Sequence, residues 1–108
     1  MIPIKPLSVN KAWQGRRFKT KDYQQFERDM LWLMPKREQV KGDVEVHYKF
    51  YLKAYGKTDV SNLIKCLEDI IVKAGWIEDD RKVIKLTAEK VRSKTDSIEI
   101  EISEYEKL

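Results

Sequence analysis

Residues 44–53 read VEVHYKFYLK, and this stretch decides the class of fold. Its apolar and polar residues alternate without a break. Successive side chains of a β-strand point to opposite faces of the sheet, so the alternation predicts a strand with one buried face. The polar set contains His47, the single histidine of the chain, with no second histidine or cysteine nearby to build a zinc site. We therefore predict that His47 is a solvated surface residue.

Two helical patterns flank this strand. The first covers residues 20–34, with Thr20 as a suitable N-cap and Pro35 as the stop. The second covers residues 60–74 and ends before Gly75. Apolar side chains recur at helical spacing in both: Tyr23, Phe26, Met30 and Leu33, then Leu63, Ile64, Leu67, Ile70, Ile71 and Ala74. Each stripe predicts a helix face that packs against the core.

Further strands are expected at both ends of the chain. Residues 1–19 indicate a short strand followed by a loop, because they carry two prolines before a glycine. Residues 82–92 and 97–104 are predicted strands, close enough in sequence to form a hairpin. The expected order is β-α-β-α-β-β. It indicates an α/β or α+β fold, with a mixed sheet and two helices in one small domain over residues 1–108.

Length and composition exclude several protein classes. A chain of 108 residues fits one domain with its own core, and no repeat or Gly/Ser linker divides it. No apolar run approaches the roughly 18 residues that span a bilayer, and the first residues lack the hydrophobic stretch of a signal peptide. The one cysteine, Cys66, allows no internal disulfide. We expect a cytoplasmic protein without a membrane partner.

The net charge of +4 is unevenly distributed along the chain. Residues 1–40 carry a net charge of +5, whereas residues 41–108 carry −1. The densest basic stretch consists of Lys11, Arg16, Arg17, Lys19 and Lys21. Such a stretch suits a polyanion such as a nucleic-acid backbone. A solvated loop that keeps the protein soluble explains the same charges equally well.

The second predicted helix carries a polar face beside its apolar stripe. Asn62, Lys65 and Asp69 are three and four residues apart, so they lie on one side of it. Asp59 stands at the start of the helix, where a carboxylate also suits the helix dipole. Asp80 follows its end. A helix of this length is about 22 Å long, so the two aspartates begin at opposite ends of it.

These residue types suit phosphodiester hydrolysis. Carboxylates such as Asp59, Asp79 and Asp80 hold Mg²⁺ or Mn²⁺ in preference to zinc, and the ion supplies a nucleophilic water and neutralises charge. Lys65 could stabilise the leaving oxygen. A structural explanation stands beside this one: an N-cap at Asp59, an ion pair between Lys65 and Asp69, and a solvated acidic turn over residues 78–80.

The spacing of these residues resembles a known family. Residues 57–65 read KTDVSNLIK, Asp69 follows, residues 74–80 read AGWIEDD, and Val83 comes next. This block resembles the RusA family of Holliday-junction resolvases, which carries an Asp-x-Asp-Asn-x-x-Lys-x-x-x-Asp motif followed by an Asp-Asp pair. Residues 6–10, PLSVN, are similar to the Pro-Ser-x-Asn opening of that family.

The resemblance implies a RusA-like fold and a homodimer that binds four-way DNA junctions. Each subunit would cut one strand with Mg²⁺, or Mn²⁺ as a substitute, giving paired symmetric nicks in DNA recombination and repair. Members are frequent in phage and prophage genomes. By motif position, Asp59 and Asp80 are the metal-binding catalytic carboxylates, and Lys65 is the catalytic lysine. Asp79 supports or shares the metal.

The remaining motif positions include one departure. The resemblance gives Asn62 a role in orienting the turn and places Asp69 against Lys65 or the metal shell. Ser61 stands where the family has its second aspartate, and a hydroxyl is a weaker magnesium ligand than a carboxylate. We expect Ser61 to hold the metal through water, with a greater need for Mg²⁺ or Mn²⁺. The alternatives are a junction-binding module that cuts weakly or not at all, and a purely structural role for Ser61 in the first helical turn.

Overall fold

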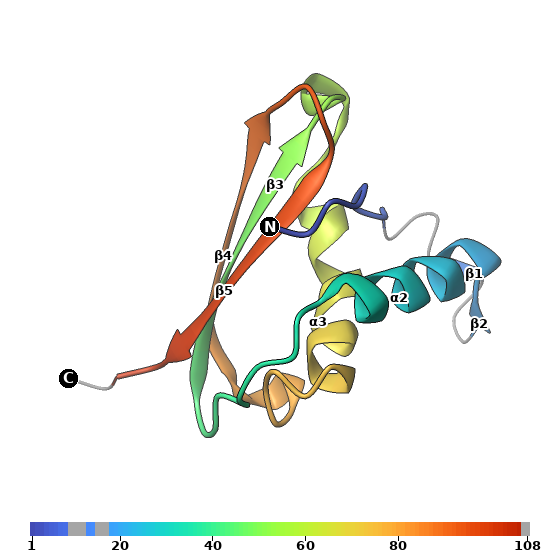
Figure 1. Cartoon of the computed structure of the whole chain (residues 1–108). Coiled ribbons are helices and arrows are strands. Elements are labelled where there is room, and N and C mark those ends of the chain that lie inside the picture. Colours follow the sequence, from blue (N-terminus) through green and yellow to red (C-terminus); the bar gives the residue numbers. More distant parts are fainter. Residues whose placement is uncertain (9–12, 15–17, 107–108) are drawn as a thin grey trace.

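Two helices cover one face of a three-stranded mixed sheet in the computed structural model of the chain (Figure 1). The structure describes residues 1–8, 13–14 and 18–106, and of residues 13, 14, 18 and 19 it describes the backbone alone. The core lies between the helices and the sheet. This architecture confirms the predicted class of two helices on a mixed sheet.

The central strand of the sheet is β3, Val44–Leu52. Its residues alternate between buried and half-buried from end to end, as the sequence pattern predicted. β4, Val83–Arg92, pairs with it in parallel, and β5, Ser97–Glu104, pairs antiparallel on the other side. β3 therefore has a hydrogen-bonded neighbouring strand along each of its two edges.

The predicted hairpin between the last two strands is wrong, because β3 lies between β4 and β5. The connection from residue 93 to residue 96 crosses the end of β3 instead. The amide of Ser93 donates to the carbonyl of Leu52 at 3.0 Å, and Asp96 Oδ1 accepts from the amide of Lys53 at 3.0 Å. β3 has the most deeply buried face of the three strands. In the central position, the backbone N–H and C=O groups along both of its edges form hydrogen bonds with a neighbouring strand.

Both predicted helices are present. α2, Lys21–Leu33, begins at Thr20, whose Oγ1 accepts from the amide of Tyr23 at 3.2 Å. α3, Ser61–Lys73, is followed by Gly75 with a φ of +76°, a conformation that favours glycine. Leu33 was expected in the buried stripe of the first helix but is 38% exposed, because that helix ends there.

The N-terminal residues reach the sheet without forming a long strand. Ile2 makes an isolated bridge to Ile98, with its amide 2.7 Å from the carbonyl of Ile98. Two short strands follow, β1 (Trp13–Gln14) and β2 (Phe18–Lys19), which pair with each other. The expected strand at the start of the chain is therefore a single bridge, and the expected loop contains a small ribbon.

The β3-α3-β4 unit fixes where the predicted site residues lie. The carboxyl end of β3 leads through a short 3-10 helix, η1 (Tyr55–Lys57), to Asp59 and α3. After α3 the chain passes through a second 3-10 turn, η2 (Asp80–Lys82), into the start of β4. Because β4 is parallel to β3, Val83 lies beside Val44, at the end of β3 remote from Asp59. Across the described residues, no helix has the length and apolar content to cross a membrane.

Candidate functional site

A cleft of about 470 Å³ lies where the N-terminal segment meets the start of α3. Lys5, Pro6 and Ser8 line it from one side, and Asp59 and Asn62 line it from the other. The two sequence segments that suggested a nuclease, residues 6–10 and 57–65, thus meet in space through their described parts. Asn10 lies outside the described residues.

Asp59 is exposed and holds the first turn of α3. Its Oδ1 accepts from Ser61 Oγ at 3.0 Å and from the Ser61 amide at 3.3 Å. The carbonyl of Asp59 accepts from the amide of Asn62 at 3.1 Å. The Asp59 side chain therefore stabilises the turn that leads into α3 through one carboxylate oxygen, although the N-cap position itself is Val60. Among the described residues, no hydrogen-bond donor is found for Oδ2.

A second group of carboxylates lies at the other end of α3. Asp79 accepts from the amide of Arg81 at 3.0 Å and from its guanidinium at 3.0 and 3.3 Å. These bonds to Arg81 hold the pKa of the Asp79 carboxyl well below its usual range. The neighbouring Asp79 carboxyl, with which Asp80 shares a hydrogen bond, raises the pKa of Asp80, and the charge of Asp69 adds to this. Asp69, Asp79 and Asp80 thus form one acidic neighbourhood.

The acidic turn is anchored to the segment that precedes β3. Trp76 and Ile77 are buried, and the amide of Val40 donates to the carbonyl of Trp76 at 3.0 Å. Glu78 accepts a hydrogen bond from the amide of Gly42, which has a φ of +76°. Local packing therefore fixes where Asp79 and Asp80 emerge from the fold.

The structure separates Asp59 from Asp80 within one chain. The thirteen residues of α3 span about 20 Å, with Asp59 before its first turn and Asp80 near Asp69 on its later turns. No three Asp, Glu, His or Cys side chains in the described ranges are arranged to hold a metal ion. Asn62 lies near Asp59, whereas Asp69 lies near Asp80.

The family model of endodeoxyribonuclease RusA matches residues 3–103. The chain belongs to the RusA endodeoxyribonuclease family. A crossover junction endodeoxyribonuclease rusA from Lactococcus phage r1t is 40% identical to it over 48 residues. That match covers 44% of this chain and 37% of the phage protein, less than half of each. The family assignment confirms the resemblance inferred from the motif.

Glu68 is an acidic neighbour in this RusA-family chain that the sequence reasoning missed. It is half-buried on α3, and burial, followed by the charges of Asp80 and Asp69, raises its pKa. A signal was present, since Glu68 stands at helical spacing from Ile64 and Ile71, inside the apolar stripe. A carboxylate in that stripe needs a polar environment, and the acidic turn lies beside it.

The structure describes Lys65 but only part of the basic stretch predicted to contact DNA. Lys65 is exposed, and in the described part of the chain it makes no ion pair with Asp69, so the anticipated intrahelical pair is absent. Lys21 is exposed on the first turn of α2. The other predicted DNA contacts, Lys11, Arg16, Arg17 and the side chain of Lys19, lie outside the described residues.

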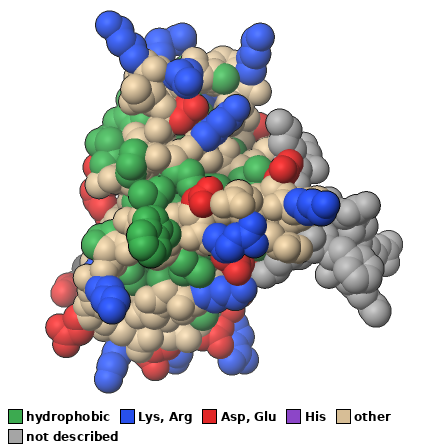
Figure 2. Space-filling model, turned by 45° about the vertical axis from the view of Figure 1, so that its right-hand side comes forward, with side chains coloured by type: hydrophobic (Ala, Val, Ile, Leu, Met, Phe, Trp, Pro, Cys, Tyr) green, Lys and Arg blue, Asp and Glu red, His purple; other side chains and the backbone are tan. Residues whose placement is uncertain are grey.

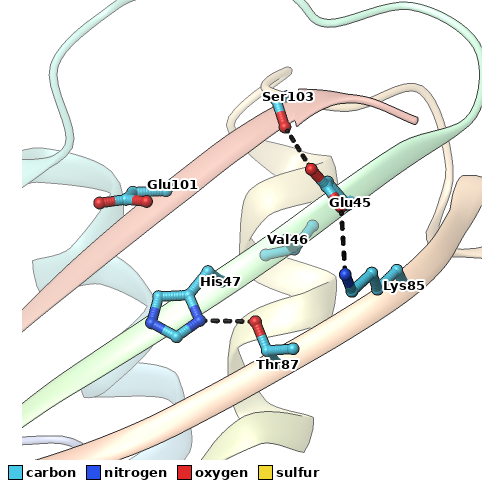
Figure 3. Close-up of a pocket in the computed structure, with 7 residues that line it drawn as sticks. All are labelled: Glu45, Val46, His47, Lys85, Thr87, Glu101 and Ser103. Atoms are coloured by element: carbon cyan, nitrogen blue, oxygen red, sulfur yellow. Dashed lines mark hydrogen bonds and ion pairs between the residues drawn. The ribbon is translucent and has the colours of Figure 1, made fainter. Parts of the chain in front are cut away.

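The outer face of the sheet carries a shallow polar pocket (Figure 3). His47 points toward Thr87 there, and its side chain is 32% exposed, so its predicted place on the polar face is confirmed. Glu45 accepts from Ser103 Oγ at 3.2 Å and pairs with Lys85 Nζ at 3.9 Å. These side chains satisfy one another, which distinguishes this face from the cleft at Asp59.

Proposed function

We propose that this RusA-family chain is a single-domain, metal-dependent endodeoxyribonuclease that resolves four-way DNA junctions by paired symmetric nicks. The observation that carries the proposal is the meeting of the two motif segments in one cleft, whose lining includes Asp59 and Asn62 as well as Lys5 and Ser8. The phage protein with a similar segment favours a phage or prophage context in DNA recombination and repair. We place this activity in the cytoplasm.

Mg²⁺ is the metal we propose, with Mn²⁺ as a substitute. The donor chemistry fits, because Asp59, Asp79 and Asp80 offer the hard oxygen atoms that these ions prefer. When bound, the ion supplies Lewis-acid stabilisation of the phosphate and an activated water. Lys65 is exposed on α3, and its proposed role is to offset charge on the phosphate. Arg81 holds Asp79 ionised and oriented.

Each site is proposed to combine the two ends of α3 from different subunits. A metal held by both Asp59 and Asp80 does not fit one chain, since Asp59 precedes the first turn of α3 and Asp80 lies near Asp69, about 15 Å further along the helix. A homodimer removes the difficulty by placing Asp59 of one subunit beside the partner's Asp80. Two-fold symmetry then creates two equal sites, one for each nick.

The exposed strand β4 offers a way to form this dimer. β4 is an edge strand, and it carries Ile84 and Leu86, which are 48% and 38% exposed. Exposed apolar side chains are not confined to β4: Figure 2 shows such side chains gathered among charged ones on one face, and Trp32 on α2 is 87% exposed. Antiparallel pairing of β4 with the partner's β4 about Thr87 sets Lys85 opposite the partner's Glu89. The same pairing brings the Asp80 end of one subunit to the Asp59 end of the other.

The test uses a synthetic four-way junction and a linear duplex of matched sequence, incubated with Mg²⁺, Mn²⁺ or EDTA. The proposal predicts metal-dependent nicks in the junction alone. Asp80→Asn should abolish them while junction binding persists, and Glu78→Gln serves as the acidic control from the same turn. Binding without cleavage in either metal would make the chain a junction-binding relative, and Ser61→Asp would then test whether the missing carboxylate is the cause.

A further inference from the structure

Lys90, near the end of β4, joins the sheet to the loop in front of α3. It lies opposite Phe50, whose side chain is buried, so it occupies the helix-side face of the sheet. Its Nζ donates to the carbonyl of Tyr55 at 2.8 Å and to the carbonyl of Thr58 at 2.9 Å. Two of the three N–H donors of the Lys90 ammonium group therefore bond to backbone oxygens of residues 55–58.

The ring of Tyr55 holds the ammonium group in this place. Lys90 Nζ lies 4.5 Å from the centroid of that ring, within the range of a cation–π interaction. The guanidinium carbon of Arg92 lies 4.7 Å from the same centroid. Two cations of β4 thus engage one aromatic side chain, and Lys90 alone of the two also bonds the loop carbonyls among the described contacts.

The loop has internal bonds, but these do not tie it to the sheet. Thr58 Oγ1 donates to the carbonyl of Ala54 at 2.8 Å, and the amide of Lys57 donates to the same carbonyl at 3.1 Å. Both bonds close the turn on itself. Among the described contacts, the hydrogen bonds that link this turn to β4 come from Lys90, beside the cation–π contacts of Lys90 and Arg92 with the Tyr55 ring.

We infer that Lys90 is a positioning residue for the Asp59 carboxylate. The carbonyl of Thr58 belongs to the peptide group whose nitrogen is that of Asp59. Because a peptide group is planar, a hydrogen bond that fixes its oxygen also fixes the nitrogen and the next Cα. Lys90 thereby sets the position from which Asp59 faces the cleft. This inference rests on the proposed role of Asp59 in metal binding.

The experiment compares Lys90→Met with Lys94→Met, a control that removes an exposed lysine four residues further along the chain. The first readout is hydrogen exchange at the amide of Asn62, which donates to the carbonyl of Asp59. Lys90→Met should speed this exchange about tenfold by loosening the first turn of α3. The second readout is the Mg²⁺ concentration for half-maximal junction cleavage, which should rise by about tenfold, with junction affinity in EDTA unchanged.

The control and a conservative variant sharpen the comparison. Lys94→Met should match the wild type in both readouts, and Lys90→Arg should restore most of the metal response, because a guanidinium can also reach two carbonyls. If Lys90→Met does not fold, Lys90→Gln keeps one donor and should shift both readouts in the same direction by less.

Two results would overturn the inference: equal exchange at Asn62 in Lys90→Met and Lys94→Met, or faster exchange with an unchanged metal requirement. Failure of the proposed function is distinguishable from either. Full cleavage by Asp59→Asn would remove the catalytic role of Asp59, and with it the functional part of the inference. The exchange measurement would still decide, independently of cleavage, whether Lys90 holds the loop.

Discussion

Mixing two inactive variants tests whether each site is shared between subunits. The perturbation is Asp59→Asn in one chain and Asp80→Asn in the other, combined so that subunits exchange. In the described fold these aspartates lie beyond opposite ends of β3. A shared site therefore takes one aspartate from each subunit. In a mixed dimer, one site then has both aspartates intact and the other has neither.

The expected magnitude follows from symmetry. Random exchange of equal amounts makes about half of the dimers mixed, and one of their two sites is intact, so about one quarter of all sites are active. Nicking should recover to about one quarter of the wild-type rate. Because a mixed dimer has one active site, it should nick one strand and should not give paired cuts.

The assay follows single nicks in a labelled four-way junction, with a mass-tagged chain to confirm that mixed dimers form. If mixed dimers are present and nicking stays at the level of the separate variants, both aspartates belong to one chain's site. That result would refute the shared-site reasoning, whereas recovery with paired cuts would show that the two positions are not both required.

Four further outcomes are expected. Leu86→Lys places a charge on the exposed edge strand and should shift the protein toward monomer in sedimentation, with loss of cleavage; an unchanged dimer would exclude β4 as the interface. Ser61→Asp should lower the Mg²⁺ concentration for half-maximal cleavage, on the order of tenfold, by adding a carboxylate, and a titration that shows no change would leave Ser61 a structural role. The raised pKa of Asp80 means that its charge is favoured less in the folded than in the unfolded chain, so Asp80→Asn should raise the melting temperature at neutral pH. That gain should vanish as the pH falls and Asp80 becomes protonated; a gain independent of pH would point to another cause. Tyr48→Phe removes a buried hydroxyl without a partner among the described residues and should stabilise the fold by about 1 kcal/mol, seen as a rise of about 4 °C in the melting temperature; a loss of stability would show that Tyr48 does have a partner.

Local patterns predicted much of the fold. The alternation of residues 44–53 predicted β3, and Thr20 and Gly75 marked a helix start and a helix end as observed. These features depend on neighbours a few residues apart, so the sequence contains them directly. The order of strands does not, because β5 pairs with β3 across the molecule. The short connection between β4 and β5 suggested a hairpin. That hairpin would leave one edge of β3 without a hydrogen-bonded neighbour, and β3 lies between the two strands instead.

Sequence patterns likewise predicted residues of the candidate site but not how those residues are arranged in space. Motif spacing marked Asp59, Lys65 and Asp80, but it could not show that Asp59 and Asp80 lie beyond opposite ends of a parallel strand pair. That separation depends on the strand to which β4 is bonded. The bonds from Lys90 to the carbonyls of Tyr55 and Thr58 also link residues more than thirty positions apart. No periodic pattern records such a contact.

Paired, metal-dependent cuts at a four-way junction are the property that would distinguish this chain as a resolvase. The most direct measurement uses a supercoiled plasmid that extrudes a cruciform, incubated with the protein and Mg²⁺. Two cuts within one binding event give linear plasmid, whereas separate cuts give nicked circles first. We predict linear product in Mg²⁺ and none in EDTA. Nicked circles alone, or intact plasmid despite tight junction binding, would contradict the proposed function.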